Sequence, residues 1–381
     1  MTVVVKLGST LVVDSNGRVR RSLLRARAGE VGALVRAGEP VCVVSSGAIA
    51  LGLPRLGLAR RPSDTSRLQA ASAVGQSRLQ AAWDSALRAA GAEAAQILLS
   101  APDLVERSSY VNVRNAFETL LKLGVVPVVN ENDATATDEI TFGDNDALAA
   151  QVAVLTRARL LVLLTEVDGV YATHPASPGA ELLADGDAAA DAVLGKGSAL
   201  GRGGMASKIA AARLAAAAGI PSVIASGRGG DVLGPIVAGE RRGTRFAAQE
   251  ADGSSAFKLW LRYAKPAAGR LIVDDGARAA LLVQGRSLLA VGVVRCEGSF
   301  SPGDAVELVA PDGNVFAKGL ASVSADEIRG RPRGVEVVHR DRLAIYDTGS
   351  AGSGVGESGS VIAPSEADDT SVAYFASTPD V

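Results

Sequence analysis

Runs of apolar, β-branched residues alternate along the first part of the chain with segments in which apolar residues recur at helical spacing. The apolar runs, which predict strands, are 3–8, 41–47, 95–100, 125–129, 160–165 and 221–227. The helical segments between them lie near 22–37, 65–90, 110–123, 146–157 and 207–218. Strands without polar alternation are typical of a sheet that is buried on both faces. The pattern therefore predicts an α/β domain with an open, mostly parallel sheet sandwiched by helices.

The pattern changes near residue 268, where short strand-like runs and turn signals begin. SPGD at 301–304 and PDGN at 311–314 are typical hairpin turns, so this part predicts a small β-rich domain. A tail rich in Gly and Ser follows it and is expected to be flexible. The predicted organisation is an α/β domain over 1–246, a linker over 247–267, the β-rich domain over 268–346 and the tail over 347–381.

The composition is that of a globular protein. The chain has 381 residues, of which 48% are hydrophobic, which suits roughly two domains. Its net charge is −2 at pH 7 and no block rich in Lys and Arg stands out, so we do not expect nucleic-acid binding. No apolar run has the length of a membrane helix, and the first residues lack the basic start of a signal peptide. We therefore expect a cytoplasmic protein that does not bind a membrane.

Cysteine and histidine give no sign of a metal centre. Cys42 and Cys296 lie far apart in the sequence, so no disulfide framework or thiolate metal site is implied, and each is expected to be a small buried apolar residue. His174 and His339 are isolated, which argues against a histidine base or a histidine metal site. We predict no metal-ligating side chains.

The loops that follow the predicted strands carry the candidate chemistry. They are KLGST at 6–10, SSGAIALG at 45–52, NENDATATDEITFGDND at 130–146, LLTEVDGVY at 163–171 and GRGGMASK at 201–208. In open α/β sheets ligands bind beyond the carboxyl ends of the strands, so these loops are expected to meet at one site. The first strand is followed by neither a P-loop nor a dinucleotide-binding motif.

Two of these loops combine glycine with lysine and are suited to a phosphate. Lys6 with Gly8, and Lys208 after the glycine-rich stretch 201–204, offer ammonium groups, an open backbone and a helix N-terminus. Ser46 either donates its hydroxyl to an anion or is the N-cap of the following helix.

The acidic loop at 130–146 leaves several alternatives open. Asp133, Asp144 and Asp146 are set among Asn and Gly residues. Such a cluster can serve acid/base chemistry, hold a metal, bind a cationic group, or be a solvated loop.

The order and spacing of these motifs resemble the amino acid kinase family, in its glutamate 5-kinase branch. The motifs that carry the resemblance are VVKLGST, VSSGAIALG, VPVVNENDATATDEITFGDND, LLTEVDGVY and GRGGMASK. NEND followed by GDND separates this branch from the aspartate and acetylglutamate kinases. In the β-rich domain, LIVDDGARAALL, SLLAVGVVRCEGSFSPGDAVEL and VVHRD resemble a PUA domain. The resemblance covers about 1–346.

The resemblance implies an activity and its partners. The fold would be the amino acid kinase fold, and the reaction would be ATP-dependent phosphorylation of the γ-carboxylate of L-glutamate, with Mg²⁺, as the first step of proline biosynthesis. Proline would be a feedback inhibitor, and the chain would form a homo-oligomer. Two alternatives stay open. One is a sister kinase that acts on another carboxylate, and the other is a regulatory protein that binds RNA through the PUA-like domain.

The resemblance also implies roles for particular residues. Those expected to contact the acceptor amino acid are Ser46, Asp133, Asp144 and Asn145. Those expected to act in catalysis are Lys6, Lys208 and Asp146. Those expected to contact the nucleotide are Lys6, Gly8, Thr165, Glu166, Arg202, Gly203, Gly204, Met205, Ala206, Ser207 and Lys208. The chain departs from the family pattern at Glu166, where Asp is usual, and at Arg202, where Thr is usual.

The implied chemistry changes the interpretation of the acidic loop. A γ-carboxylate with an ordinary pKa of about 4.3 is ionised at pH 7 and needs no general base. The loop is therefore expected to receive the ammonium group of the amino acid. Asp146 is expected to orient the two lysines, to cap the helix that starts there, or to do both. The acids expected to be solvated loop charges are Glu131, Asp138 and Glu139.

Overall fold

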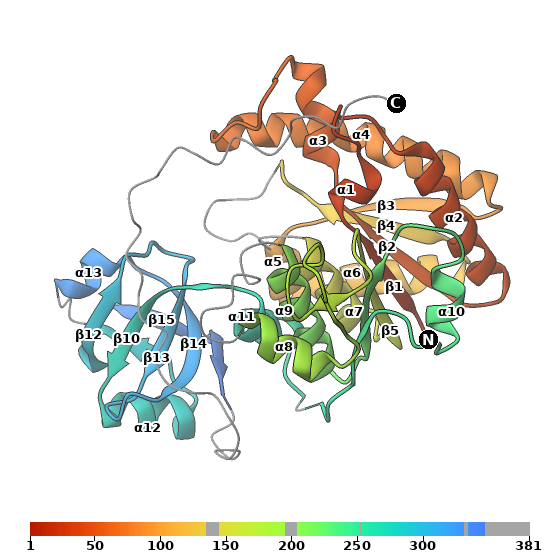
Figure 1. Cartoon of the computed structure of the whole chain (residues 1–381). Coiled ribbons are helices and arrows are strands. Elements are labelled where there is room, and N and C mark those ends of the chain that lie inside the picture. Colours follow the sequence, from red (N-terminus) through yellow and green to blue (C-terminus); the bar gives the residue numbers. More distant parts are fainter. Residues whose placement is uncertain (135–144, 195–203, 252, 331–333, 347–381) are drawn as a thin grey trace. The chain divides into compact units, whose positions relative to one another are not determined.

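The computed structural model describes residues 1–134, 145–194, 204–251, 253–330 and 334–346 (Figure 1). The predicted tail over 347–381 lies outside these residues. All structural statements below concern the described residues.

A seven-stranded sheet forms the frame of the first domain, with strand order β3-β4-β2-β1-β5-β8-β9 (Figure 1). All pairs are parallel except β8 with β9. The strands are β1 Val3–Leu7, β2 Val41–Ser45, β3 Ala94–Leu99, β4 Val126–Glu131, β5 Leu160–Thr165, β8 Ser222–Ser226 and β9 Thr244–Phe246. The carboxyl ends of the parallel strands therefore all lie on the same side of the domain, and β1 is the central strand.

Helices cover both faces of this sheet (Figure 1). Successive strand residues point to opposite faces, so Val3 and Val5 of β1 belong to one core and Val4 to the other. The core of Val3 and Val5 includes residues of α1 Ser9–Val12, α2 Arg21–Arg36, α3 Ala48–Gly52, α4 Thr65–Ala89 and α10 Leu233–Val237. The core of Val4 includes residues of α5 Ala101–Val105, α6 Arg107–Lys122, α7 Asn145–Leu155, α8 Gly186–Leu194 and α9 Gly204–Ala217. The predicted helix-covered parallel sheet is confirmed.

The sequence pattern misses the short elements. These are α1, the 3-10 helix Leu53–Leu56, α5, β6 Val170–Tyr171, β7 Leu182–Leu183, α8, α10 and β9. Most of the helices have fewer than two turns, and the strands have only two or three residues. Such elements are too short to show a clear hydrophobic period.

The predicted linker over 247–267 contains a helix, α11 Ala256–Tyr263. Ser255 caps it by accepting a hydrogen bond from the backbone N–H of Lys258. Its apolar side is buried, and Phe257 and Trp260 pack with ring centroids 5.7 Å apart. Burial of these rings stabilises a helix that the sequence pattern did not predict within this segment.

The second domain is built on a six-stranded sheet with strand order β11-β15-β14-β13-β10-β12. Its elements are β10 Ala267–Val273, α12 Asp275–Gln284, β11 Leu288–Leu289, the 3-10 helix Ala290–Gly292, β12 Val293–Gly298, β13 Ala305–Val309, β14 Val315–Ala321, α13 Ala325–Arg329 and β15 Glu336–Ile345. The sheet has its own core, in which Leu271, Val306 and Phe316 are buried. The β-rich class is confirmed, although α12 and α13 add helices that the pattern did not predict.

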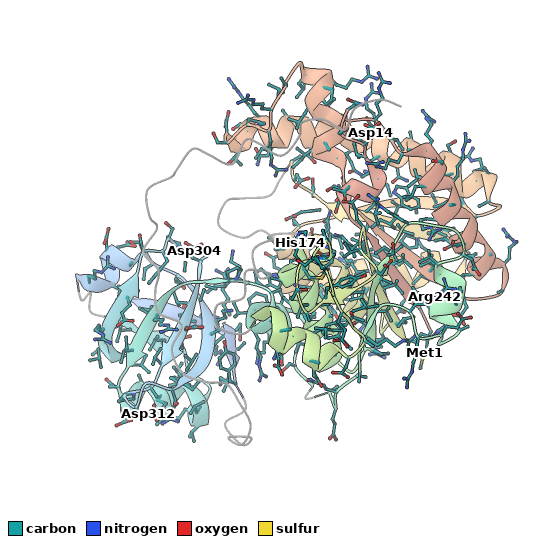
Figure 2. The ribbon with its side chains drawn as sticks, viewed as in Figure 1. Met1, Asp14, His174, Arg242, Asp304 and Asp312 are labelled. Atoms are coloured by element: carbon teal, nitrogen blue, oxygen red, sulfur yellow. The ribbon has the colours of Figure 1, made fainter. Side chains whose placement is uncertain are left out.

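Both predicted turns lie between strands, but only PDGN joins a hairpin, that of β13 with β14, because β12 and β13 each pair with β10 and not with each other. Asp304 accepts a hydrogen bond from Ser301 N at 2.9 Å, and Asp312 accepts one from Asn314 N at 2.9 Å. Figure 2 labels both aspartates. Gly313 has φ 88°, a value that glycine adopts without strain.

The remaining predictions about composition can be compared with the structure. Cys42 is buried, but Cys296 is only partly buried, so the prediction of burial is wrong for Cys296. His174 is exposed in the connection between β6 and β7 (Figure 2). Among the described helices, none has the length and hydrophobicity that crossing a bilayer requires.

Candidate active site

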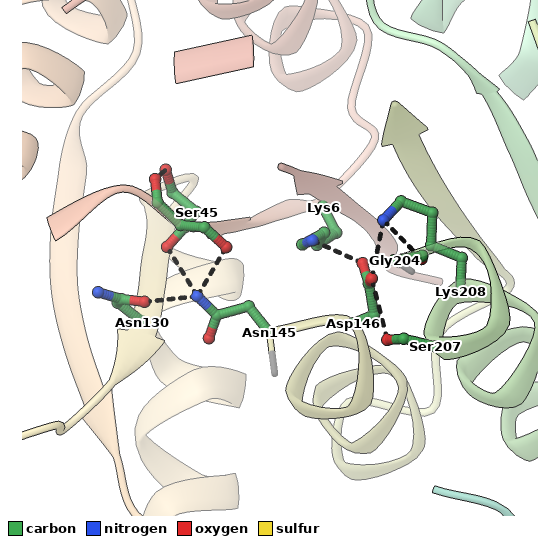
Figure 3. Close-up of polar contacts among 9 residues, drawn as sticks. Lys6, Ser45, Asn130, Asn145, Asp146, Gly204, Ser207 and Lys208 are labelled. Atoms are coloured by element: carbon green, nitrogen blue, oxygen red, sulfur yellow. Dashed lines mark hydrogen bonds and ion pairs between the residues drawn. The ribbon is translucent and has the colours of Figure 1, made fainter. Parts of the chain in front are cut away.

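Three charged side chains from three separate elements meet beyond the carboxyl end of β1 (Figure 3). Lys6 follows Val4 by two residues and so points to the same face of the sheet, where α7 and α9 pack. Asp146 lies in the first turn of α7, and Lys208 in the second turn of α9. The Nζ atom of Lys6 is 2.6 Å from Asp146 Oδ1, and that of Lys208 is 2.9 Å from Asp146 Oδ2. One carboxylate thus holds two ammonium groups.

This charged cluster is buried. The exposed fractions are 4% for Lys6, 2% for Asp146 and 8% for Lys208. Burial opposes the charged form of Asp146, but the two ammonium groups outweigh it and hold the pKa of Asp146 below its ordinary value. Ser207 also donates to Asp146 Oδ2, at 3.2 Å. The cluster carries two positive charges against one negative charge, so it is suited to bind an anion.

A second group of polar side chains surrounds Asn145, the residue before Asp146. The amide nitrogen of Asn145 donates to Ser46 Oγ at 2.8 Å and to Asn130 Oδ1 at 2.8 Å (Figure 3). The amide oxygen of Asn145 is buried and has no hydrogen-bond partner among the described residues. A buried acceptor without a partner is costly, so this oxygen is available to a donor on a ligand.

Asp133 lies just after β4 and accepts a hydrogen bond from the hydroxyl of Ser72 on α4. Burial raises the pKa of the Asp133 carboxyl, while the bond from Ser72 and the charge of Arg61 act against this rise. A partly desolvated carboxylate of this kind gains most from a cationic partner.

Comparison with known proteins agrees with this geometry. The model of the amino acid kinase family matches residues 1–226, the part of the chain that carries both clusters.

The chain belongs to the amino acid kinase family.

Curated relatives narrow the position of this kinase within the family. It is 46% identical over 362 residues to a protein of Sphingopyxis alaskensis, covering 90% of this chain and 96% of the relative. It is 44% identical over 361 residues to one of Pseudomonas syringae pv. tomato, covering 90% and 97%, and 42% identical over 362 residues to one of Acinetobacter baumannii, covering 90% and 96%. All three are named glutamate 5-kinase.

Two further similarities were found. The PUA domain family matches residues 269–341 of this kinase, within the predicted β-rich domain. Among solved structures, isopentenyl phosphate kinase is similar at 23% identity with a TM-score of 0.48, covering 64% of this chain and 99% of that one.

The residues predicted to contact the nucleotide lie in two places in the kinase domain. Thr165 ends β5, and its carbonyl accepts a hydrogen bond from Gly227 N at 2.7 Å. Glu166 forms an ion pair with Arg228, which follows β8. A cavity of about 280 Å³ at this edge is lined by Asp168, Ser226, Arg228 and Arg242 among others. A larger cavity, of about 390 Å³, lies at the amino ends of β5 and β8, and none of the predicted site residues lines it.

The other predicted nucleotide contacts lie at the start of α9 and the end of β1. Gly204, Met205, Ala206 and Ser207 precede Lys208 in α9, and the carbonyl of Gly204 accepts a hydrogen bond from Lys208 Nζ at 3.2 Å. Gly8 follows β1, and the nearest described atom to a Cβ built there is Leu164 O at 3.9 Å. That leaves room for a ligand to approach the backbone at Gly8.

Some of the predictions are not tested by the structure, and one is wrong. Asp144, Arg202 and Gly203 lie outside the described residues, as do Asp138 and Glu139. Ser46 is not the N-cap of α3, because that position belongs to Gly47, whose φ of 119° suits glycine. A side chain at Gly47 would also place its Cβ 2.9 Å from Val13 Cγ2.

The structure adds residues that the sequence did not single out. Ser72 and Gln76 reach the site from α4, Asn130 from β4, and Arg228 from the loop after β8. Ser72 and Gln76 had a signal in the sequence, since they are polar residues on the apolar side of the predicted helix 65–90. Arg228 had none, because its partner Glu166 lies far away in the sequence.

Proposed function

We propose that this chain is a glutamate 5-kinase, which transfers the γ-phosphoryl group of ATP to the γ-carboxylate of L-glutamate in the first step of proline biosynthesis. The observation that carries the proposal is the buried cluster of Lys6, Asp146 and Lys208 beside the polar group around Asn145. The first suits the transferring phosphoryl group, and the second suits the amino acid end of the acceptor. The names of the curated relatives support the same substrate.

The two lysines supply what this reaction needs most. The acceptor carboxylate is already ionised at neutral pH, so no base has to remove a proton. The obstacle is repulsion between that carboxylate and the phosphates of ATP, which amounts to about 4 kcal/mol for a charge pair 4 Å apart at an effective dielectric constant near 20. Lys6 and Lys208 offset this repulsion and stabilise the charge on the phosphoryl oxygens in the transition state.

Asp146 acts on the reaction through these lysines. Both of its oxygens hold ammonium groups, at 2.6 and 2.9 Å. The carboxylate therefore fixes both cations before the substrates arrive, and positioned charges need no reorganisation during the reaction.

The acceptor is held through its amino acid end. The unpartnered oxygen of Asn145 and the carboxylate of Asp133 accept from the ammonium group, and the hydroxyl of Ser46 donates to a carboxylate. Asp133 gains a cationic partner in the complex, which compensates the burial that raises its pKa. A substrate with a blocked amino group lacks the charge that these oxygens favour.

The phosphates of the nucleotide would hold Mg²⁺ at this site. Among the described residues no group of three or more His, Cys, Asp or Glu side chains could hold a metal ion, and both oxygens of Asp146 are taken by lysines. Mg²⁺ is commonly held by phosphates and water with few protein ligands, so the phosphates of ATP are suited to hold it. When bound, the ion neutralises phosphate charge.

We also propose where the nucleotide base binds, how the enzyme is inhibited, and its oligomeric state and location. The nucleotide base lies by the cavity beside Thr165 and Glu166, proline inhibits the enzyme, the chain forms a homo-oligomer, and the reaction takes place in the cytoplasm. The support for the base position is the cavity at the carboxyl ends of β5 and β8, where ligands of open α/β sheets bind.

A substrate panel tests the proposed function. Purified protein is assayed for ADP release from ATP with L-glutamate, L-aspartate or N-acetyl-L-glutamate, each with Mg²⁺ or EDTA. We expect turnover with L-glutamate that requires Mg²⁺, and at least about a hundredfold lower kcat/KM with the other two acceptors. Equal turnover with aspartate or N-acetylglutamate would assign the chain to a sister kinase.

A further inference from the structure

The buried side of helix α4 contacts three residues at or next to the acceptor site, namely Asp133, Asn130 and Ser45. Ser72, Gln76 and Trp83 lie on one face of the helix, since their spacing is close to one and three helical turns. Their exposed fractions are 3%, 8% and 0%. Ser72 donates to Asp133, and Trp83 Nε1 donates to Ser45 Oγ at 2.8 Å.

Gln76 lies between these two contacts and is the start of a chain of amides. Gln76 Oε1 accepts from Asn130 Nδ2 at 2.9 Å, and Asn130 Oδ1 accepts from Asn145 Nδ2 at 2.8 Å. Asn145 Nδ2 also donates to Ser46 Oγ (Figure 3). Each amide has one donor end and one acceptor end, so fixing the first orientation fixes the next.

The geometry points to Gln76 as a positioning residue for the amino acid acceptor. Because its oxygen fixes the amide of Asn130, and Asn130 fixes that of Asn145, the oxygen of Asn145 is left without a partner among the described residues and can accept from the substrate's ammonium group. This inference rests on the proposed function, since the ammonium group is that of glutamate.

The packing of α4 keeps this orientation in place. A Cβ at Gly75, next to Gln76, would lie 1.8 Å from the carbonyl oxygen of Ala48 in α3. The close contact between α3 and α4 therefore depends on a glycine, and α3 directly follows the loop that carries Ser46. Helix α4 thus packs closely against the helix that follows the Ser46 loop.

A rotated amide would reverse the preference of the site. If Asn145 presented its NH₂ group instead of its oxygen, a donor would face the ammonium group and the hydrogen bond would be lost. Hydrogen bonds to charged groups contribute enough that their loss lowers affinity about 10- to 100-fold.

Gln76→Leu tests the inference, with Gln80→Leu as the matched control. Gln80 lies one turn further along α4, and its Oε1 has no hydrogen-bond partner among the described residues. We expect Gln76→Leu to raise KM for L-glutamate about 10- to 100-fold while KM for ATP changes less than about threefold. Gln80→Leu is expected to leave both within about threefold. If Gln76→Leu leaves KM for glutamate unchanged, or raises both KM values equally, Gln76 does not position the acceptor.

Two more variants keep the test independent of folding. Gln76→Glu retains an acceptor oxygen and is expected to keep KM for glutamate within about threefold of wild type. If Gln76→Leu does not fold, Gln76→Asn replaces it, because the shorter side chain withdraws the acceptor from Asn130 while staying polar. A Gln76→Glu variant as defective as Gln76→Leu would contradict the inference.

A double-mutant cycle shows whether Gln76 acts through Asn145. In an Asn145→Ala background the oxygen that Gln76 orients is gone, so Gln76→Leu is expected to add less than about a threefold further rise in KM. Additive effects would mean that Gln76 acts by another route. Wild-type turnover of glutamate is measured first. Its absence would reject the proposed function, whereas an active wild type with a normal Gln76→Leu variant would reject only the positioning role.

Discussion

Replacing Asp146 by Asn removes the negative charge between the two lysines while keeping nearly the same side-chain shape. In the variant one amide end can still accept from one lysine, but its NH₂ end faces the other ammonium group. Two buried cations then remain without an anion between them. At about 3 Å and an effective dielectric constant near 20, each charge pair in the native site is worth about 5 kcal/mol before desolvation is subtracted.

The net loss is smaller than this sum because burying the charges has a cost. Removing one partner of a buried ion pair typically lowers the free energy of unfolding by about 3–5 kcal/mol. For a domain of this size that corresponds to a fall in melting temperature of roughly 6–20 °C. We also expect kcat/KM for glutamate to fall about 10²- to 10³-fold, since the lysines lose their common anchor.

Asp187→Asn is the matched control for this experiment. Asp146 and Asp187 are both the second residue of a helix, in α7 and α8, but Asp187 is exposed. Both substitutions remove the same favourable interaction with the helix dipole, worth about 0.3–1 kcal/mol. The difference between the two variants in urea or thermal unfolding isolates the lysine contacts.

The pH dependence gives a second check. The pKa of Asp146 is lowered in the folded protein, so its contribution is complete above the ordinary carboxyl pKa and is lost as the pH falls through the folded value. The stability difference between wild type and Asp146→Asn should be constant from about pH 6 to 8 and should shrink below about pH 4. The assigned role of Asp146 would be refuted if Asp146→Asn lowered the free energy of unfolding by an amount within about 1 kcal/mol of that for Asp187→Asn. A kcat/KM of Asp146→Asn within about threefold of wild type would refute it as well.

Three further substitutions test other parts of the site. Lys208→Ala is expected to lower kcat about 10²- to 10³-fold with the fold intact by circular dichroism, and near-normal turnover would exclude its role in phosphoryl transfer. Ser72→Ala removes a hydrogen bond that opposes the raised pKa of Asp133, so the acid limb of kcat/KM for glutamate should move to higher pH; an unmoved limb would show that Asp133 does not need its charge. Gly75→Ala should destabilise the protein by more than about 2 kcal/mol in urea unfolding, since its Cβ would meet Ala48 O at 1.8 Å, and a stable variant would mean that α3 and α4 can separate without cost.

Hydrophobic periodicity was enough to predict the frame of the first domain. The runs at 3–8, 41–47 and 160–165 consist mostly of apolar residues without polar alternation because these strands are buried on both faces, and each run contains a strand in the structure. The loops after these strands could be named for the same reason, since parallel strands place their carboxyl ends on one edge. Helix α11 was missed because the burial of Phe257 and Trp260 stabilises it. A segment this short does not show a hydrophobic period from which that burial could be predicted.

The sequence by itself determined which residue types are available to the site: two lysines, a group of acids and asparagines, and the loops that carry them. Only the tertiary structure decided which of them touch. Asp146 contacts both Lys6 and Lys208 because α7 and α9 cover the face of β1 that carries Lys6. The three residues lie far apart in the sequence. The amide chain from Gln76 to Asn145 likewise depends on the fold, because Asn130 of β4 bonds both to Gln76 of α4 and to Asn145 of α7, although the two helices belong to the cores on opposite faces of the sheet. Packing between elements that are far apart in the sequence decides which side chains become partners. Neither the hydrophobic periodicity nor the spacing of motifs along the chain encodes these partners.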